Sequence, residues 1–333
     1  MSAADLLPPG APVAQPAPAA VVAGDAFVDL TSTTAADGGP AYAPHPGGSC
    51  LNVAVGLGRL GVPTALLARV SDDGFGGLVR RHLTGSSVAE TFLLPSTDPT
   101  GLSVADVVDG VAGYRFYNEG TADRGLRPEH LAGLALPPDA ALHVGSVALA
   151  YEPQAGTLTG LLRAEAGRRL VSLDPNVRPS VIADRDRYLA QLTEWVGLSD
   201  VVKVSDEDLA WLHPGEAVET VARRWLDAGP ALVLVTSGAA GAWAATASAE
   251  ARVGTPRVVV ADTVGAGDAF MSATLAFLWR TGRLDRAGAG SLDADALEAL
   301  LTYAARVAAD TCTRAGAEPP RWADGLVPEA PVS

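Results

Sequence analysis

The sequence predicts an α/β fold, with a doubly wound, mostly parallel sheet flanked by helices and a small β-sheet lid. Three observations support this prediction. Short runs of Val, Ala and Leu alternate with segments of helical periodicity, as in buried parallel strands joined by helices. Polar or glycine-bearing residues follow these runs, at the edge where open α/β sheets bind ligands. Two segments, about 30–46 and 100–121, interrupt the alternation as candidate lid strands, and the second predicts a hairpin with its turn at Asp109-Gly110.

Composition and charge restrict the classes of function. The chain has 333 residues, 48% of them hydrophobic, which suffices for one large domain. Its formal net charge is −14, so it repels nucleic-acid phosphates and anionic membrane surfaces, and we expect neither as a partner. No apolar run approaches the roughly 18 residues that cross a membrane. Cys50 and Cys312 match no metal-ligand spacing, so we expect reduced thiols in a cytoplasmic protein.

The organisation of the chain follows from these patterns. Residues 1–19 are rich in Pro and Ala and are expected as a disordered tail, 20–325 as one folded domain, and 326–333 as a C-terminal tail. Continuous apolar runs predict the strands of the main sheet at 20–24, 64–70, 141–147, 169–173, 200–204, 231–236 and 257–261.

Lys203 is the only lysine in the chain. It precedes Val204-Ser205 and therefore fits neither a P-loop, nor the strand lysine of a protein kinase, nor a Schiff-base lysine. If the protein handles nucleotide phosphates, backbone N–H groups, arginines and a metal ion are expected to hold them.

The segment ADTVGAGDAF (261–270) carries the strongest local signal. It follows the apolar run RVVVA and opens a helical pattern that runs to Arg280. Gly265 and Gly267 let successive backbone N–H groups point at an anion in front of the helix, where the helix dipole is positive. Asp268 could accept a proton from a hydroxyl that attacks a phosphoryl group bound there. Asp268 could also serve only to favour the helix dipole.

The segment PGGSCLNVAVGLGRLGVP (46–63) predicts a helix entered through two glycines. Gly47 and Gly48 permit close approach of a ligand to the backbone, and Asn52 lies one turn later, where its amide suits sugar hydroxyls. The motif GLGRLG (56–61) formally matches a dinucleotide-binding pattern. Because it follows no strand, we interpret it as a helix-packing motif. The alternative hypothesis of a dinucleotide oxidoreductase depends on this motif alone.

These two motifs, in this order, resemble the signatures of the ribokinase-like (PfkB) family of sugar and nucleoside kinases, with a pattern closest to fructokinases. The resemblance covers about residues 20–325 and includes GDAFVDL (24–30), VSDDGFG (70–76), KVSDEDLAWL (203–212), VTSGAAGAW (235–243) and TRAGAEPP (313–320). It implies a ribokinase-like fold and an ATP-dependent kinase that transfers the γ-phosphoryl group to a primary hydroxyl of a free sugar. It also implies Mg²⁺ as a cofactor and K⁺ as a candidate activating cation.

The resemblance assigns roles to residues at matching positions. Asp268 matches the catalytic base, and Gly265, Ala266 and Gly267 match the anion hole. The expected sugar-binding residues are Asp25, Asp29, Gly47, Gly48 and Asn52, and the expected nucleotide-binding residues are Lys203, Ser205, Thr236, Gly238 and Gly241. The family's magnesium-organising N-x-x-E motif is represented by Ser205 and Asp208, which keeps an acid but shortens it. Asp262 and the backbone of Val264 match a loop that holds a monovalent cation.

Two segments bear on the sugar. DPNVRP (174–179) and GYRFYNEGTAD (113–123) resemble segments of fructokinases and ketodeoxygluconate kinases. Arg178 could bind a substrate oxygen, or instead form an ion pair between strand and helix. Tyr117 is taken to face the sugar, and since strand residues alternate, its neighbour Phe116 is then core. Fructose is the favoured substrate, with 2-keto-3-deoxygluconate and ribose as alternatives.

A catalytically silent sugar-binding regulator is the alternative outside the enzymes. Only the departure at Ser205 and Asp208 argues for it, whereas the intact base and glycine loop argue against it. In either case a small-molecule sugar is the expected partner. The edge of the lid sheet could pair with a second subunit and form a homodimer.

Overall fold

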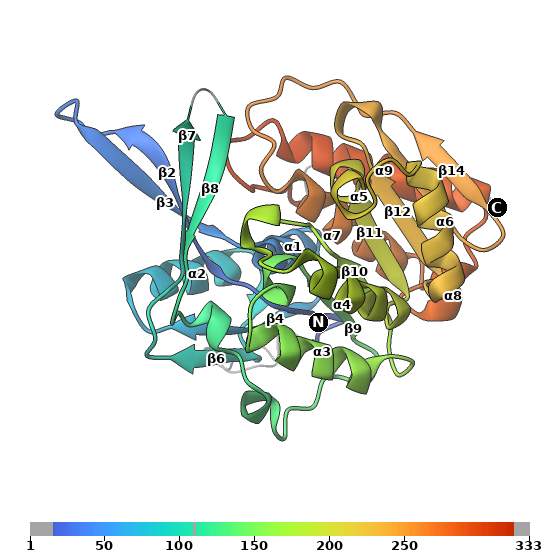
Figure 1. Ribbon diagram of the computed structural model, residues 1–333, viewed down its shortest axis with the longest axis horizontal. Helices are drawn as coiled ribbons and strands as arrows, with labels where there is room; N and C mark the ends of the chain where they lie inside the picture. Colours follow the sequence, from blue (N-terminus) through green and yellow to red (C-terminus); the bar gives the residue numbers. More distant parts are fainter. Residues whose placement is uncertain (1–15, 109–110, 323–333) are drawn as a thin grey trace, which may run out of the picture.

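A mixed ten-stranded sheet forms the centre of the computed structural model, which describes residues 16–108 and 111–322 (Figure 1). Most of the predicted N-terminal tail, the predicted C-terminal tail and the predicted turn at Asp109-Gly110 lie outside the described residues. In spatial order the strands are β14 (Glu250–Val253), β13 (Ala242–Ala245), β12 (Leu232–Thr236), β11 (Val201–Ser205), β10 (Val171–Asp174), β9 (Ala141–Gly145), β1 (Ala20–Ala23), β4 (Thr64–Ser71) and β5 (Val88–Ala89), and β6 (Leu93–Ser96) also pairs with β4.

The strands from β12 to β5 run parallel, as the continuous apolar runs predict. β1 lies in the middle, where Ala20 pairs with Thr64 of β4 on one side and with Ala141 of β9 on the other. β13 and β14 add an antiparallel edge. The carboxyl ends of the parallel strands meet at one edge of the sheet, so the polar residues that follow β1, β10 and β11 gather there.

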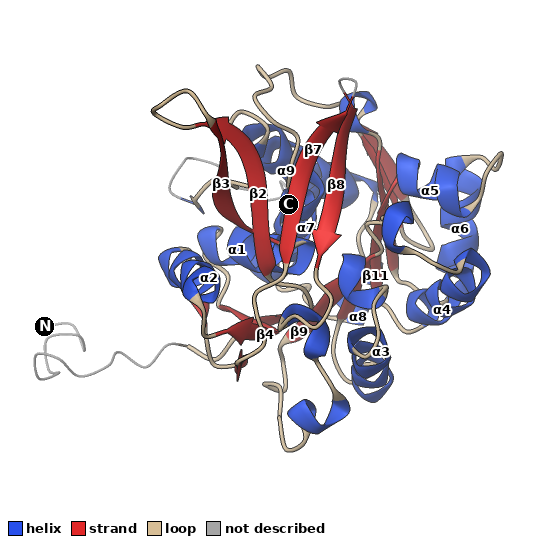
Figure 2. Ribbon diagram, turned by 60° about the vertical axis from the view of Figure 1, so that its left-hand side comes forward, coloured by secondary structure: helices blue, strands red, loops and turns tan. Residues whose placement is uncertain are grey.

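Helices cover both faces of this sheet and bury two separate cores (Figures 1 and 2). Val21 and Val22 are both fully buried but belong to opposite cores, which is why the strands are apolar at every position. No helix within the described ranges is long and apolar enough to cross a membrane. One face carries α1 (Ser49–Arg59), α2 (Gly74–Gly85), α7 (Ala266–Arg280), α8 (Arg286–Gly290) and α9 (Ala294–Thr311), and the other α3 (Gln154–Glu165), α4 (Arg185–Gly197), α5 (Asp206–Leu212) and α6 (Val218–Ala228).

The two segments expected as a lid come together in a separate four-stranded sheet, called here the small sheet (Figure 2). β2 and β7 pair in parallel at its centre, and the flanking pairs are antiparallel. The small sheet lies next to α1 and α2, beside the edge of the main sheet where its strands end. Its order is β3 (Pro40–Gly47), β2 (Phe27–Thr34), β7 (Leu102–Val108) and β8 (Val111–Tyr117).

The strand predicted at 257–261 is wrong. These residues have no strand structure, and Val259 is 89% exposed. The edge of β12 is already occupied, because the chain turns back at once through 237–241 and pairs β13 against it. The three valines at 258–260 therefore cross the surface towards α7 instead of entering the sheet. A run of valines predicts a strand only where a sheet edge is free to receive it.

The GLGRLG motif is confirmed as a helix-packing motif. It lies in the last turns of α1, and a Cβ on Gly56 would lie 2.3 Å from Ser272 Oγ of α7. A Cβ on Gly58 would lie 2.3 Å from the Ser86 carbonyl oxygen. Both glycines thus let α1 approach neighbouring backbone and side chains more closely than alanine would.

We expect Gly58→Ala to lower the free energy of unfolding by about 1–3 kcal/mol, because the new methyl group overlaps a backbone oxygen that cannot move alone. Urea denaturation measures this change. Gly160→Ala is the matched control: this exposed glycine of α3 has open space around its Cβ, so the change is expected to be neutral or stabilising by about 1 kcal/mol. Equal stability of Gly58→Ala and wild type would contradict the packing role.

Candidate active site

The N-terminus of α7 is the candidate anion-binding surface. Gly265, the residue before the helix, has φ 75°, a left-handed conformation that suits glycine, and a Cβ there would lie 2.5 Å from Ala317 Cβ. The first N–H groups of a helix have no partner within the helix, so that of Gly267 is available to an anion. The N–H of Ala266 donates to the Thr263 carbonyl oxygen at 3.3 Å, a long hydrogen bond. Asp268 belongs to this first turn and is 6% exposed.

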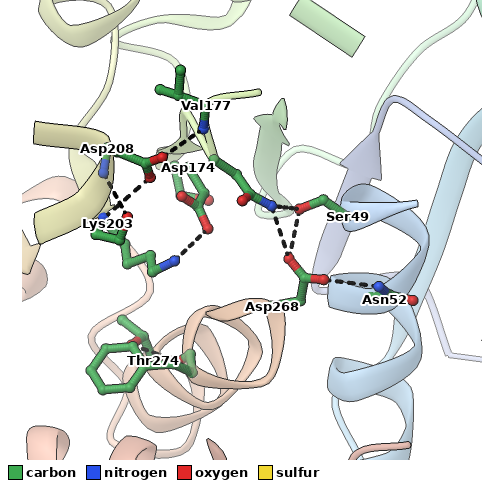
Figure 3. Close-up of polar contacts among 12 residues, drawn as sticks. Ser49, Asn52, Asp174, Val177, Lys203, Asp208, Asp268 and Thr274 are labelled. Carbon is green, nitrogen blue, oxygen red and sulfur yellow. Dashed lines mark hydrogen bonds and ion pairs between the residues drawn. The ribbon is translucent and has the colours of Figure 1, made fainter. Parts of the chain in front are cut away.

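The Asp268 carboxylate is held by α1 (Figure 3). Ser49 Oγ donates to its Oδ1 at 2.6 Å, and Asn52 Nδ2 donates to its Oδ2 at 2.8 Å. No side chain of the helix start caps α7. The Asp268 side chain therefore bonds to the neighbouring helix α1 and does not cap α7. This contact argues against the interpretation in which Asp268 serves only its own helix. Asn52, expected at the sugar, contacts the expected base directly.

Asp25 secures the start of α1. Its carboxylate accepts hydrogen bonds from the backbone N–H groups of Ser49, at 2.9 Å, and Cys50, at 3.2 Å. Gly48 precedes the helix with φ 111°, and a Cβ there would lie 2.9 Å from the Asp25 carbonyl oxygen. Burial raises the pKa of Asp25, and the negative charge of Asp268 adds to this rise. Asp25 thus orients the helix that carries Ser49 and Asn52.

Asp29 and Gly47 lie close together on neighbouring strands of the small sheet. Asp29 of β2 pairs with His45 of β3, and a Cβ on Gly47 would lie only 2.1 Å from Asp29 Oδ2. Burial raises the pKa of Asp29 to about 6, and the negative charge of Asp25 adds to this rise. The glycine predicted from the sequence is therefore required to make room for this carboxylate.

Lys203 and Asp174 form a buried ion pair beside the anion-binding surface (Figure 3). Lys203 Nζ lies 2.9 Å from Asp174 Oδ2, and the two side chains are 4% and 0% exposed. A Cβ on Gly267 would lie 2.8 Å from the same Nζ, so the ammonium borders the first turn of α7. Burial alone would lower the pKa of Lys203, but the nearby carboxylates of Asp174, Asp208 and Asp268 raise it overall.

Asp208 and Ser205 form a capping box at the start of α5. Ser205 Oγ accepts from the N–H of Asp208 at 3.0 Å, and the N–H of Ser205 donates to Asp208 Oδ2 at 3.3 Å. Asp208 Oδ1 also accepts from the N–H of Val177 at 2.9 Å. In the part of the chain that the structure describes, no group of three or more His, Cys, Asp or Glu side chains could hold a metal ion.

The residues expected at ATP lie at the turn after β12. Thr236 ends this strand, and Gly238 and Gly241 both have positive φ, at 47° and 106°. A Cβ on Gly241 would lie 2.0 Å from the Val253 carbonyl oxygen, so the close turn requires glycine. A cavity of about 210 Å³ borders this turn and is lined in part by Ser237, Gly241, Trp243 and Arg252.

Asp262 fastens the loop before α7 to the C-terminal segment. Its Oδ1 accepts from the N–H of Val264 at 3.1 Å, and its Oδ2 accepts from the N–H of Gly316 at 2.8 Å. The backbone N–H groups of Ala261 and Asp262 both donate to the Cys312 carbonyl oxygen. Asp262 therefore joins this loop to the C-terminal segment, and its role with Val264 in holding a cation stays a prediction.

Tyr117 and Arg178 are the most exposed of the expected substrate residues. Tyr117 ends β8 and is 55% exposed, whereas Phe116 packs edge-on against Phe27 with ring centroids 5.9 Å apart. Within the described residues, Arg178 donates hydrogen bonds only to its neighbours Asn176 and Val177, and it forms no ion pair with a carboxylate there. Its remaining N–H groups are therefore available to a ligand.

Three residues that the fold brings to this site have no role predicted from the sequence. Ser49, Asn176 and Asp174 contact Asp268 or Lys203 directly. Asp174 was recognisable as a polar residue at the end of a strand, but its partner was not. Ser49 carries no local signal of its own, and Asn176 is marked only as part of DPNVRP. Their contacts with Asp268 span 219 and 92 residues of sequence, so no local pattern reveals them.

A buried carboxylate beside an open helix N-terminus defines a site for transferring an anionic phosphoryl group to a hydroxyl. Residues 19–324 match the model of the pfkB family of carbohydrate kinases, and the chain belongs to this family.

Known proteins agree with this assignment. A fructokinase of Rhizobium leguminosarum bv. trifolii is 38% identical over 274 residues, which cover 82% of this chain and 84% of that protein. A Klebsiella pneumoniae fructokinase is 37% identical over 264 residues, covering 77% and 83%. Among solved structures, the Xylella fastidiosa fructokinase with bound ATP superposes with a TM-score of 0.81 at 27% identity, covering 90% of this chain and 93% of that one. A Vibrio cholerae fructokinase with fructose, ADP and calcium gives 0.76 at 30% identity, covering 90% and 94%.

Proposed function

We propose that this protein is an ATP-dependent fructokinase. The observation that carries the proposal is the buried Asp268 carboxylate, held by α1 beside the open N-terminus of α7. The fructokinase relatives support fructose as the substrate, and the neighbouring structure with bound ATP supports the phosphoryl donor. 2-Keto-3-deoxygluconate kinase and ribokinase are the alternative activities.

The proposed reaction is an in-line transfer. A primary hydroxyl oxygen of the sugar attacks the γ-phosphorus of ATP, the bond from phosphorus to the β-phosphate oxygen breaks, and ADP leaves. Asp268 accepts the hydroxyl proton as the new bond forms. The N–H groups of residues 265–267 and the Lys203 ammonium stabilise the negative charge on the transferred group, since the ammonium borders the first turn of α7.

On the sugar side, we propose that Asp29, Gly47 and the exposed Arg178 meet the hydroxyls. The small sheet, with Tyr117 on β8, would close over the sugar and exclude water, so that ATP is not hydrolysed. A carboxylate and a guanidinium supply acceptors and donors respectively, which suits a polyol.

Mg²⁺ fits this site as a metal held mainly by phosphate and water. Both Asp208 oxygens already accept backbone N–H groups, so its carboxylate suits a contact through water, and the described residues offer no all-protein cage. When bound, Mg²⁺ would neutralise charge on the ATP phosphates. Asp262 and the Val264 backbone are proposed to hold K⁺.

The proposed assembly and location follow from the cysteines and from the edges of the small sheet. The free cysteines Cys50 and Cys312 favour a reducing compartment, so we place the enzyme in the cytoplasm. The outer strands of the small sheet, β3 and β8, have edges that a second subunit could pair with, giving a homodimer. Sedimentation of the full chain measures that state.

The function is tested by ADP release from magnesium-ATP with fructose, ribose, 2-keto-3-deoxygluconate, fructose 6-phosphate and adenosine. Fructose is expected to give the highest kcat/KM. Higher efficiency with another sugar would replace fructose as the substrate but keep the kinase. Sugar binding without turnover on any acceptor would instead support the silent regulator.

We expect the KM for fructose to rise about tenfold between pH 7 and pH 5. The pKa of Asp29 is raised to about 6, so the ionised acceptor is present above pH 6 and is lost as the pH falls through this value. Steady-state kinetics at fixed saturating ATP measures the change.

Two variants locate the source of this pH dependence. Asp29→Asn should have a raised KM that no longer varies with pH. Asp123→Asn is the matched control, because burial also raises the pKa of Asp123 to about 6 but this residue has no proposed contact with the sugar. Two results would contradict the role of Asp29: a wild-type KM that does not vary with pH, or a pH dependence that is lost in Asp123→Asn but kept in Asp29→Asn.

A further inference from the structure

A chain of hydrogen bonds connects the surface of the site to Asp268. Arg178 Nη1 donates to Asn176 Oδ1 at 2.7 Å, Asn176 Nδ2 donates to Ser49 Oγ at 3.0 Å, and Ser49 Oγ donates to Asp268 Oδ1 at 2.6 Å. Asn176 Nδ2 also lies 3.5 Å from Asp268 Oδ1. The four residues come from three separate parts of the fold: the segment after β10, the start of α1 and the first turn of α7.

The direction of each hydrogen bond is determined by chemistry. A guanidinium can only donate, so the amide oxygen of Asn176 must face Arg178 and its NH₂ group must face Ser49. The Ser49 oxygen then accepts from this NH₂ group, and its single proton is left to point at Asp268. Reversing any one of these hydrogen bonds would place two donors or two acceptors in contact.

The backbone supports the same arrangement. Asn176 has φ 39°, a left-handed conformation that Asn and Asp adopt more readily than other non-glycine residues. Ser49 is 7% exposed, and its N–H is bound to Asp25, which restrains its backbone at the start of α1. Asn52 holds the other oxygen of Asp268, so the carboxylate is restrained at both ends.

We infer that Ser49 and Asn176 are positioning residues that aim the Asp268 carboxylate and connect it to Arg178. The inference builds on the proposed kinase function. A base accepts a proton efficiently only when its oxygen is directed at the reacting hydroxyl, and small misplacements carry large losses in rate. Because Arg178 is exposed and holds the far end, a sugar oxygen that binds it would stabilise the aligned state of the whole chain.

The test separates positioning from binding. Ser49→Ala removes the hydroxyl, and we expect kcat to fall about 10- to 100-fold while the KM values for fructose and ATP stay within about threefold of wild type. Ser49→Thr restores a hydroxyl at the same position and should recover most of kcat. Ser199→Ala, a buried serine whose hydroxyl donates to Trp195 at the far end of the main sheet, is the matched control and should retain wild-type kcat.

Asn176→Asp provides a second variant that keeps the left-handed backbone. It replaces the donor to Ser49 with an acceptor beside Asp268, and should lower kcat at least as much as Ser49→Ala. Unchanged kcat in both variants, or a loss that appears only in KM, would overturn the inference.

A failure of the proposed function gives a different result from a failure of this inference. If wild type phosphorylates no sugar in the panel, the proposed kinase function is wrong. The contact between Ser49 and Asp268 is then tested by measuring the free energy of unfolding. In that case Ser49→Ala, Asp268→Ala and the double variant are compared by urea denaturation. Coupled residues give non-additive free energies of unfolding, and strict additivity would overturn the chain of hydrogen bonds.

Discussion

Asp268→Asn is expected to lower kcat by about a thousandfold while the KM for the sugar changes little. The variant keeps the size of the side chain and its hydrogen bond from Ser49, but an amide cannot accept the hydroxyl proton during transfer. With the new amide oxygen towards Ser49, its NH₂ group faces the NH₂ group of Asn52, so the Asn52 amide must turn over to present its oxygen as the acceptor. The loss should therefore appear in the chemical step, and ADP release at saturating fructose and ATP measures it.

Protein integrity and background hydrolysis are the controls for this result. Circular dichroism and ATP binding should match those of wild type, because Asp268 does not belong to either hydrophobic core. A variant that keeps more than about a tenth of wild-type kcat would show that another group accepts the proton, and the assignment of Asp268 as base would have to be withdrawn.

Lys203→Met is expected to lower the free energy of unfolding by about 3–5 kcal/mol. Methionine fills a similar volume but leaves the Asp174 carboxylate, which is 0% exposed, without the ammonium that pairs with it. Asp174 Oδ1 already has no hydrogen-bond partner within the described residues, so the remaining oxygen cannot share the cost. Urea denaturation near neutral pH measures the change.

Asp174→Asn combined with Lys203→Met should recover much of this stability, because the buried charge is then removed as well. Arg163→Met is the matched control for an ion pair: Arg163 bonds Glu194 at the surface, and its loss should change stability by less than about 1 kcal/mol. If Lys203→Met were no more destabilising than Arg163→Met, the buried pair would not support this part of the fold. The double variant should remain catalytically weak if the ammonium also stabilises the transferred phosphate.

Local patterns predicted most of the fold. Runs such as 64–70 and 231–236 became β4 and β12 almost without change, because a parallel strand covered on both faces must be apolar at each position. The failure at 257–261 has the opposite cause. The same composition is exposed there, since β13 had already taken the position beside β12, and no local pattern records which strand pairs there.

The sequence by itself determined the α/β class, the glycine turns at 47–48 and 265–267, and Asp268 as the candidate base. These features depend on neighbouring residues, whose backbone geometry and periodicity can be derived locally. Only the tertiary structure decided which side chains surround that base. Ser49, Asn176 and the Asp174–Lys203 pair come together because parallel strands end at one edge of the sheet, which places residues far apart in sequence within hydrogen-bond distance.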